Sequence, residues 1–183
     1  MLGEDNMKYL LYLLTFIFSL PILLGATMIT TLNTYEFIYD TEYNKDIANP
    51  NMSMVLLSIE STETEEKKIP FFYDTISYDS PYHFNWILHS KYKGIKINEN
   101  YILVNGEEKI SLNKDLIDDG KYQNSYVFET KEQSIDIDVN TTTYIEVILD
   151  YTTNGIEQKN RYRYNLEYKK ETGNRLWWAI MSV

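Results

Sequence analysis

The chain contains two histidines, His83 and His89, and histidine is the side chain most used for metal binding and proton transfer near neutral pH. On a β-strand the two would share one face about 20 Å apart, and on a helix they would point to different sides. A zinc site needs further ligands at close spacing, and the chain has no cysteine to supply them. We therefore expect no metal site at this pair, and no thiol chemistry or disulfide.

Asp136, Asp138 and Asn140 have the spacing of the first ligands of a calcium loop. Such a loop needs a glycine next, where this chain has Thr141, and a glutamate at its twelfth position, where it has Val147. Isoleucine and valine alternate with aspartate here, which indicates a strand with one face in water. A weak calcium site between loops stays open as an alternative.

Other signatures of catalysis or nucleotide binding are absent from the sequence. There is no G-x-S-x-G elbow to activate a serine, and neither a G-x-G-x-x-G turn nor a P-loop to hold phosphates. Carboxylate pairs suited to glycoside hydrolysis cannot be assigned without their separation in space. The formal net charge of -10 repels phosphate backbones, so we expect no nucleic-acid partner. No stretch carries a family signature, and we expect a non-catalytic protein without a cofactor.

Aromatic residues form the best candidate binding surface. The chain has 17 tyrosines, and Tyr162, Tyr164 and Tyr168 share one face of a predicted strand with Leu166. We call these residues the tyrosine stripe. It is interpreted first as the strand face that packs into the core, because charged residues alternate with it along the strand. The functional alternative is an aromatic platform for a glycan or a peptide.

The C-terminal stretch 176–183 contains a second aromatic candidate, Trp177 and Trp178. The stretch is too short to span a membrane. It fits a final core strand. The alternative is an exposed apolar tail that docks on a partner or enters the membrane interface, where tryptophan is favoured.

The segment 9–29 decides where these residues act, because it is apolar and contains no charged residue. As a helix it would be about 30 Å long, which matches the hydrocarbon core of a bilayer. We interpret it as an uncleaved signal anchor and keep two alternatives, a cleaved signal peptide and a buried core helix. Pro21 suits the cleaved peptide, but cleavage after Ala26 would place Leu24 where a small residue is needed.

The basic residues on the two sides of this segment indicate its orientation. Lys8 precedes it, and no basic residue follows until Lys45. The positive-inside rule therefore favours a cytoplasmic N-terminus at 1–8 and a periplasmic or extracellular C-terminal part. We expect a transmembrane anchor at 9–29, a membrane-proximal linker at 30–52 and a β-domain at 53–183. The cleaved alternative would give a secreted protein.

Short alternating runs separated by turns predict the domain after the anchor. Asn105-Gly106 and Asn154-Gly155 predict two hairpins. The expected strands lie at 53–59, 69–73, 80–92, 101–104, 109–112, 125–129, 134–139, 144–151 and 159–168. The run 35–43 fits an additional first strand, and the alternative for it is an aromatic belt in which Tyr35 and Tyr39 lie at the membrane surface. The run 80–92 also permits a helix that begins at Ser80-Pro81. The sequential strands favour an antiparallel, Ig-like β-sandwich of about seven to nine strands.

The segments between the expected strands are polar. We expect a solvated loop at 61–68, a turn at 49–51 and a connection at 113–120 with room for one helical turn.

Three functional hypotheses follow. The first is a membrane-anchored module that binds another envelope protein, as a complex subunit or an inhibitor. The second is a carbohydrate- or ligand-binding module that uses exposed tyrosines. The third is a hydrolase with an unrecognised carboxylate site.

Overall fold

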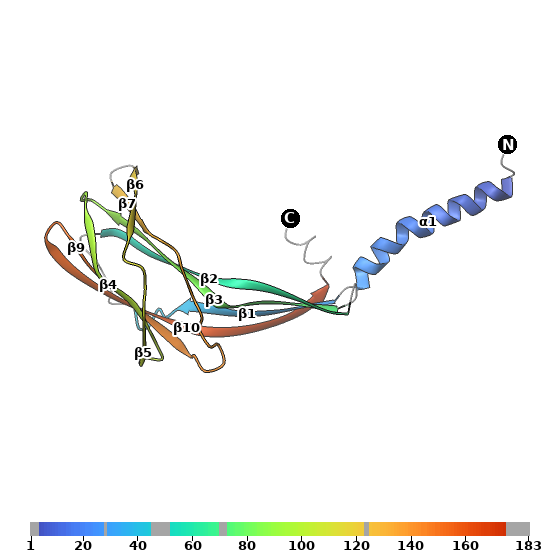
Figure 1. Ribbon diagram of the computed structural model, residues 1–183. Helices are drawn as coiled ribbons and strands as arrows, with labels where there is room; N and C mark the ends of the chain where they lie inside the picture. Colours follow the sequence, from blue (N-terminus) through green and yellow to red (C-terminus); the bar gives the residue numbers. More distant parts are fainter. Residues whose placement is uncertain (1–3, 28, 45–51, 70–72, 123–124, 175–183) are drawn as a thin grey trace. The chain divides into compact units, whose positions relative to one another are not determined.

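The computed structural model describes residues 4–27, 29–44, 52–69, 73–122 and 125–174. This part of the chain forms one helix and ten strands (Figure 1). Their bounds are α1 Glu4–Thr27, β1 Ile29–Tyr39, β2 Met52–Ile69, β3 Tyr73–Ser90, β4 Ile95–Val104, β5 Glu108–Ser111, β6 Leu116–Tyr122, β7 Ser125–Thr130, β8 Gln133–Ile135, β9 Tyr144–Thr153 and β10 Ile156–Asn174.

Helix α1 covers most of the uncharged N-terminal segment. It ends at Thr27, and β1 begins at Ile29. The end comes earlier than predicted because β-branched residues, which favour the extended backbone, follow from 29 to 31. Within the described residues no helix is both long and apolar enough to cross a membrane, so the transmembrane span predicted at 9–29 is not found there.

The chain divides into two compact units. The smaller unit contains residues 1–33, 64–77 and 169–183, and the larger unit contains residues 34–63 and 78–168. In the smaller unit, the hydroxyl of Thr31 lies 3.1 Å from that of Tyr73 and 3.4 Å from that of Thr172. These contacts link β1, β3 and β10 through side chains as well as through the backbone.

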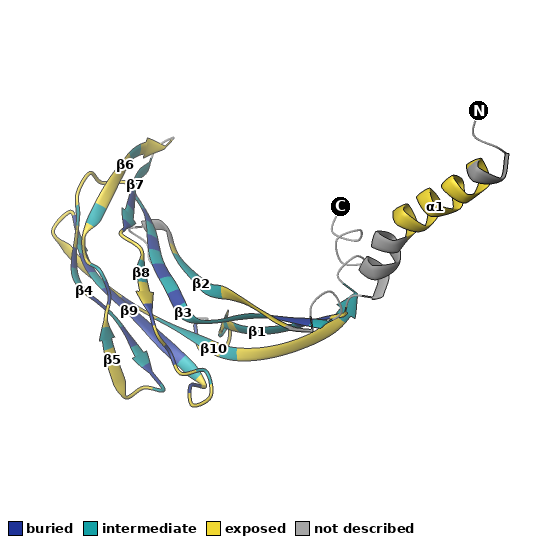
Figure 2. Ribbon diagram, turned by 45° about the vertical axis from the view of Figure 1, so that its right-hand side comes forward, coloured by how far each residue is buried: buried dark blue, intermediate teal, exposed yellow. Residues whose placement is uncertain are grey.

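All ten strands belong to one sheet, so the predicted Ig-like pair of stacked sheets is not confirmed. The strand order is β5-β4-β9-β10-β1-β3-β7-β6, and β2 and β8 also pair with β3. The pairs β9–β10, β4–β9, β4–β5, β3–β7, β3–β8 and β6–β7 are antiparallel. Figure 2 shows the strands of the larger unit as a curled, open sheet.

Curling lets one sheet enclose its own core. Tyr82, Phe84, Trp86 and Leu88 alternate along β3 and are almost fully buried, as their period of two predicted. The same core cluster contains residues 145, 147, 149 and 151 of β9. The strand interpretation of 80–92 is therefore confirmed as far as Ser90, and the helix alternative is wrong.

The two predicted hairpins are present. Asn105 and Gly106 connect β4 to β5, and Asn154 and Gly155 connect β9 to β10. All four residues have positive φ, at 50°, 79°, 49° and 75°. Two consecutive positive φ angles match the twist of the flanking strands, which explains why Asn-Gly marks the turn in the sequence.

The charged stretch 61–68 is not the predicted loop but part of β2. Thr62 Oγ1 donates a hydrogen bond to the carbonyl of Pro81 at 2.6 Å, and Tyr78 Oη donates to Glu63 at 2.8 Å. Residues 63–67 are exposed. A strand with a solvated face tolerates charge, so charge alone did not identify a loop.

Two shorter predictions need correction, and two others lie partly or wholly outside the described residues. Of the predicted strand at 69–73, Ile69 ends β2 and Tyr73 begins β3, and residues 70–72 lie outside the described part of the chain. The connection at 113–120 contains the start of β6, whose register against β7 shifts between Asp118 and Gly120, and no helical turn forms at 116–120. The strand at 134–139 is shortened to β8, although its alternation of buried and exposed residues continues to 138. The turn at 49–51 lies outside the described residues.

Candidate binding surface

Tyr162 and Tyr164, the predicted stripe on β10, pack inward in the larger unit. Tyr162 lies 5.9 Å from Trp86 between ring centroids, and Tyr164 meets Tyr39 edge-on at 5.5 Å. Both rings are half-buried against the core cluster. Burial, helped by the nearby Tyr151 and Tyr39, raises the pKa of Tyr162 to about 12. These two rings therefore belong to the packing of the fold.

Tyr168 is different, because half of it is exposed at 51%. Its ring lies 4.7 Å from that of Tyr35 on β1, at an interplanar angle of 31°. The structure thus divides the predicted stripe into two packed rings and one accessible ring. Trp177 and Trp178, the other predicted binding residues, lie outside the described residues.

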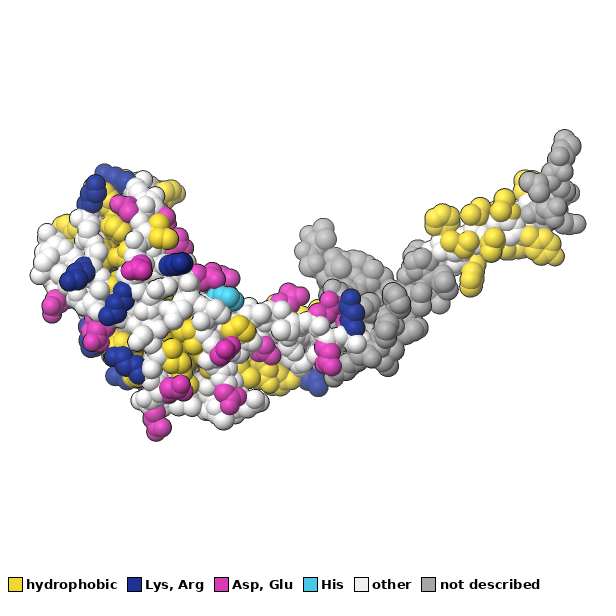
Figure 3. Space-filling model, in the orientation of Figure 1, with side chains coloured by type: hydrophobic (Ala, Val, Ile, Leu, Met, Phe, Trp, Pro, Cys, Tyr) yellow, Lys and Arg dark blue, Asp and Glu magenta, His cyan; other side chains and the backbone are white. Residues whose placement is uncertain are grey.

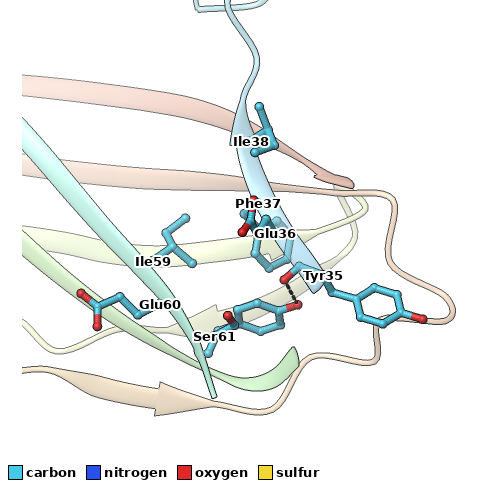
Figure 4. A pocket seen from close by; sticks show the side chains of 8 residues that line it. Tyr35, Glu36, Phe37, Ile38, Ile59, Glu60 and Ser61 are labelled. Carbon is cyan, nitrogen blue, oxygen red and sulfur yellow. Dashed lines mark hydrogen bonds between the residues drawn. The ribbon is translucent and has the colours of Figure 1, made fainter. Parts of the chain in front are cut away.

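Next to Tyr35, a cleft of about 300 Å³ opens between β1 and β2. Figure 4 shows residues 35–38 on β1 and residues 59–61 on β2 along its two sides. The lining residues combine aromatic, aliphatic and acidic side chains: Tyr35, Glu36, Phe37, Ile38, Ile59, Glu60, Ser61 and Tyr82. No sequence pattern indicated this cleft, because its two sides come from strands that are not neighbours in the sheet.

Tyr82 fixes the inner side of the cleft. Its hydroxyl donates a hydrogen bond of 3.0 Å to the backbone carbonyl of Tyr35, drawn as the dashed line in Figure 4. Its ring meets Phe37 edge-on at 4.8 Å. Burial, with a smaller contribution from the charge of Asp79, raises the pKa of Tyr82, so the hydroxyl stays protonated and keeps donating.

The two histidines have separate neighbours. His83 Nδ1 lies 2.9 Å from a carboxylate oxygen of Glu132, and its Nε2 lies 3.3 Å from Thr62 Oγ1. His89 is opposite Val127 in the pairing of β3 with β7. Within the described residues, no group of histidines and carboxylates is arranged to hold a metal ion.

Asp138 accepts the hydrogen bonds of a turn. Its carboxylate accepts hydrogen bonds from the backbone N–H of Asn140 at 3.0 Å and from the hydroxyl of Thr141 at 3.1 Å. These bonds, the backbone one first, lower the pKa of Asp138.

One charged cluster was missed by sequence analysis. Glu146 on β9 is buried, with 2% of its side chain exposed, and accepts hydrogen bonds from Arg161 and from Arg163, the latter at 2.7 Å. The guanidinium of Arg163 also lies 3.9 Å from the ring centroid of Tyr43 and 4.5 Å from that of Tyr144. The hairpin register, which places Arg163 opposite Glu146, was the available signal.

This cluster attaches the turn after β1 to β10. The side-chain amide of Asn44 donates to the carbonyl of Arg163 at 2.8 Å, and its oxygen accepts the N–H of Arg163 at 2.9 Å. Burial would raise the pKa of Glu146, but the hydrogen bonds from the two arginines outweigh it and hold that pKa below its usual range. A carboxylate that is enclosed by two arginines and has a lowered pKa is suited to a structural role.

The comparisons with known proteins identify no relative. No family model, no curated protein and no solved structure matches the chain. Any functional conclusion therefore depends on the chain's own geometry.

Proposed function

We propose that this protein is a membrane-anchored module that binds another protein of the cell envelope and has no catalytic role. The observation that carries the proposal is the exposure of α1: every residue from 7 to 19 is exposed, and Lys8 is the only charged one among them. Figure 3 shows hydrophobic side chains over the described part of this helix. A contiguous apolar surface of this kind is unfavourable in water, and a lipid bilayer would remove it from water.

The direction of insertion follows from charge. Lys8 lies at the N-terminal side of the apolar run, and the acidic β-strand part follows it. This distribution supports a cytoplasmic N-terminus and a β-domain in the periplasm or outside the cell.

Membrane association is tested by replacing Ile17, which is 51% exposed on α1, with aspartate. A charged residue near the centre of a membrane helix costs about 2.5–3.5 kcal/mol, so membrane-bound protein should fall about 100-fold relative to soluble protein. Ile117→Asp on β6 is the matched control, because Ile117 is 52% exposed. Both variants and the parent chain are compared after alkaline extraction of membranes.

Extraction of the parent chain as a soluble protein would contradict the anchor, as would equal effects of the two substitutions. Orientation is tested separately with a C-terminal reporter that is active only outside the cytoplasm. Protein binding is tested by chemical cross-linking in intact cells, where the proposal requires one specific, saturable partner.

A further inference from the structure

The two Asn-Gly pairs that form hairpin turns are also chemically labile. An asparagine can lose its side-chain amide by reaction with the backbone nitrogen of the next residue, and glycine at that place has no Cβ to shield the nitrogen. Asn105-Gly106 lies between β4 and β5, and Asn154-Gly155 lies between β9 and β10. The two asparagines have nearly equal φ angles, at 50° and 49°. The turns therefore share a backbone conformation and differ in their surroundings.

The side-chain amide of Asn105 is held at both ends. Its Nδ2 donates a hydrogen bond of 3.0 Å to the carbonyl of Thr141. Its Oδ1 accepts the backbone N–H of Thr143 at 2.9 Å and the hydroxyl of the same residue at 3.0 Å. The hydroxyl of Tyr144 lies 2.9 Å from the position that a Cβ on Gly106 would take. The amide must therefore break several bonds before it can turn toward its own backbone, and a neighbouring side chain covers the turn.

The amide of Asn154 lacks this support. Asn154 and Gly155 are both exposed. Among the described residues, none holds the Asn154 side chain by a hydrogen bond. A Cβ on Gly155 would meet nothing within 4 Å. The side chain can rotate onto the backbone without losing a contact, and water reaches the turn.

We propose that Asn154 is a site of spontaneous deamidation, whereas Asn105 is protected from it. The nitrogen of Gly155 bonds to Cγ of Asn154, the bond from Cγ to Nδ2 breaks, and the proton of the attacking N–H leaves with the amide as ammonia. A water molecule then opens the resulting succinimide ring. Opening at Cγ gives aspartate, and opening at the main-chain carbonyl gives isoaspartate. Water is the only co-reactant.

Isoaspartate would lengthen the backbone of this turn, because the chain then runs through the former side chain. The turn places Thr153 opposite Ile156 in the pairing of β9 with β10, and two consecutive positive φ angles suit that pairing. Thr153 is 1% exposed, and its hydroxyl lies 3.4 Å from that of Ser90 on β3. The modification thus disturbs a buried contact beside the turn. It needs neither a membrane nor a partner protein, so it does not depend on the proposed function.

The test follows both turns in one sample of the full-length chain. The protein is incubated in uncharged detergent micelles at mildly alkaline pH in water labelled with heavy oxygen, digested in acid, and analysed by mass spectrometry. The new carboxylate takes an oxygen from water, so the label marks deamidation during the incubation. We expect label at Asn154 to accumulate at least about tenfold faster than label at Asn105, which must first lose its hydrogen bonds. Equal rates, or a faster reaction at Asn105, would overturn the proposal.

Incubation of the same chain in urea is the matched control. Unfolding removes the contacts of Asn105 and leaves both Asn-Gly pairs intact, so the two sites should then react at similar rates. A difference that persists in urea would come from the local sequence and would overturn the structural explanation. Absence of label at Asn154 in the folded chain, together with its appearance in urea, would refute the site.

The variant Asn154→Gly tests the consequence for the fold. It removes the reactive amide and keeps a residue that accepts positive φ. Urea unfolding is measured before and after the incubation. The midpoint of the parent chain should fall as label accumulates, and that of Asn154→Gly should not change. An unchanged midpoint in the labelled parent chain, or an equal fall in both, would contradict the proposed disturbance at Thr153.

Discussion

Replacing Glu146 with glutamine should destabilise the larger unit in a pH-dependent manner. The substitution keeps the size of the side chain but removes the charge that Arg161 and Arg163 neutralise. A hydrogen bond to a charged group contributes about 1.5–3 kcal/mol, and leaving a buried partner uncompensated can cost about 3–5 kcal/mol. Arg161 and Arg163 are 50% and 28% exposed, so water compensates both guanidiniums in part. We therefore expect a loss of about 2 kcal/mol at pH 7.

The contribution of Glu146 to the free energy of unfolding should decrease as the pH falls. Because the pKa of Glu146 is lower in the folded state, its contribution is fully present above the unfolded-state value of about 4.3. The contribution is lost as the pH falls through the folded-state pKa. The difference between the parent chain and Glu146→Gln should thus be constant from about pH 7 to pH 5 and should shrink below that range.

Urea unfolding in detergent micelles, followed by tryptophan fluorescence, measures both effects. Lys159→Met is the control, because its pair with Asp150 is on the surface, with the lysine side chain 63% exposed. We expect that control to leave the free energy of unfolding unchanged. A loss for Glu146→Gln no larger than the control's, or one that does not shrink in acid, would refute the structural role of the carboxylate.

Three further comparisons test the packing by urea unfolding, followed by tryptophan fluorescence except for Trp86→Phe, which removes the core fluorophore and is followed by circular dichroism. A Cβ on Gly106 would lie 2.9 Å from a tyrosine hydroxyl, whereas one on Gly155 meets nothing within 4 Å, so Gly106→Ala should cost about 1 kcal/mol more than Gly155→Ala. Trp86→Phe removes the indole's 3.0 Å hydrogen bond to a buried amide and should cost about 2–3 kcal/mol. Tyr162→Ala should cost about 3 kcal/mol and Tyr168→Ala less than about 1, because only the first ring packs against the core; similar losses for both would contradict their different burial.

The sequence predicted those parts of the fold that depend on neighbouring residues. Asn-Gly turns require positive φ at consecutive residues, which few other residue pairs tolerate, so the turns of both hairpins were found. Alternation along 82–88 identified a strand in spite of the Ser80-Pro81 signal for a helix, since the side chains at 82, 84, 86 and 88 all face the core. The apolar N-terminal run likewise predicted α1, although not its end.

The sequence did not predict features that depend on which strands meet. Sequential strands with turns are compatible with two stacked sheets or with one curled sheet, and only pairing across the chain distinguishes them. The charge of the stretch 61–68 indicates solvation and not backbone conformation, so the place of this stretch in β2 could not be predicted from charge. The tyrosine stripe was recognised as one face, but its division into packed and exposed rings depends on where Trp86 and Tyr35 lie.

The amino-acid sequence by itself determined the local elements of this protein: its apolar helix, its alternating strands and its Asn-Gly turns. These features follow from backbone sterics and from the period of side-chain burial, which are properties of short segments. Tertiary structure alone decided that the strands form one curled sheet, that Glu146 is enclosed by two arginines, and that β1 and β2 border a cleft. The reason is physical: contacts between distant segments depend on the closure of the whole sheet, and no short segment specifies that closure.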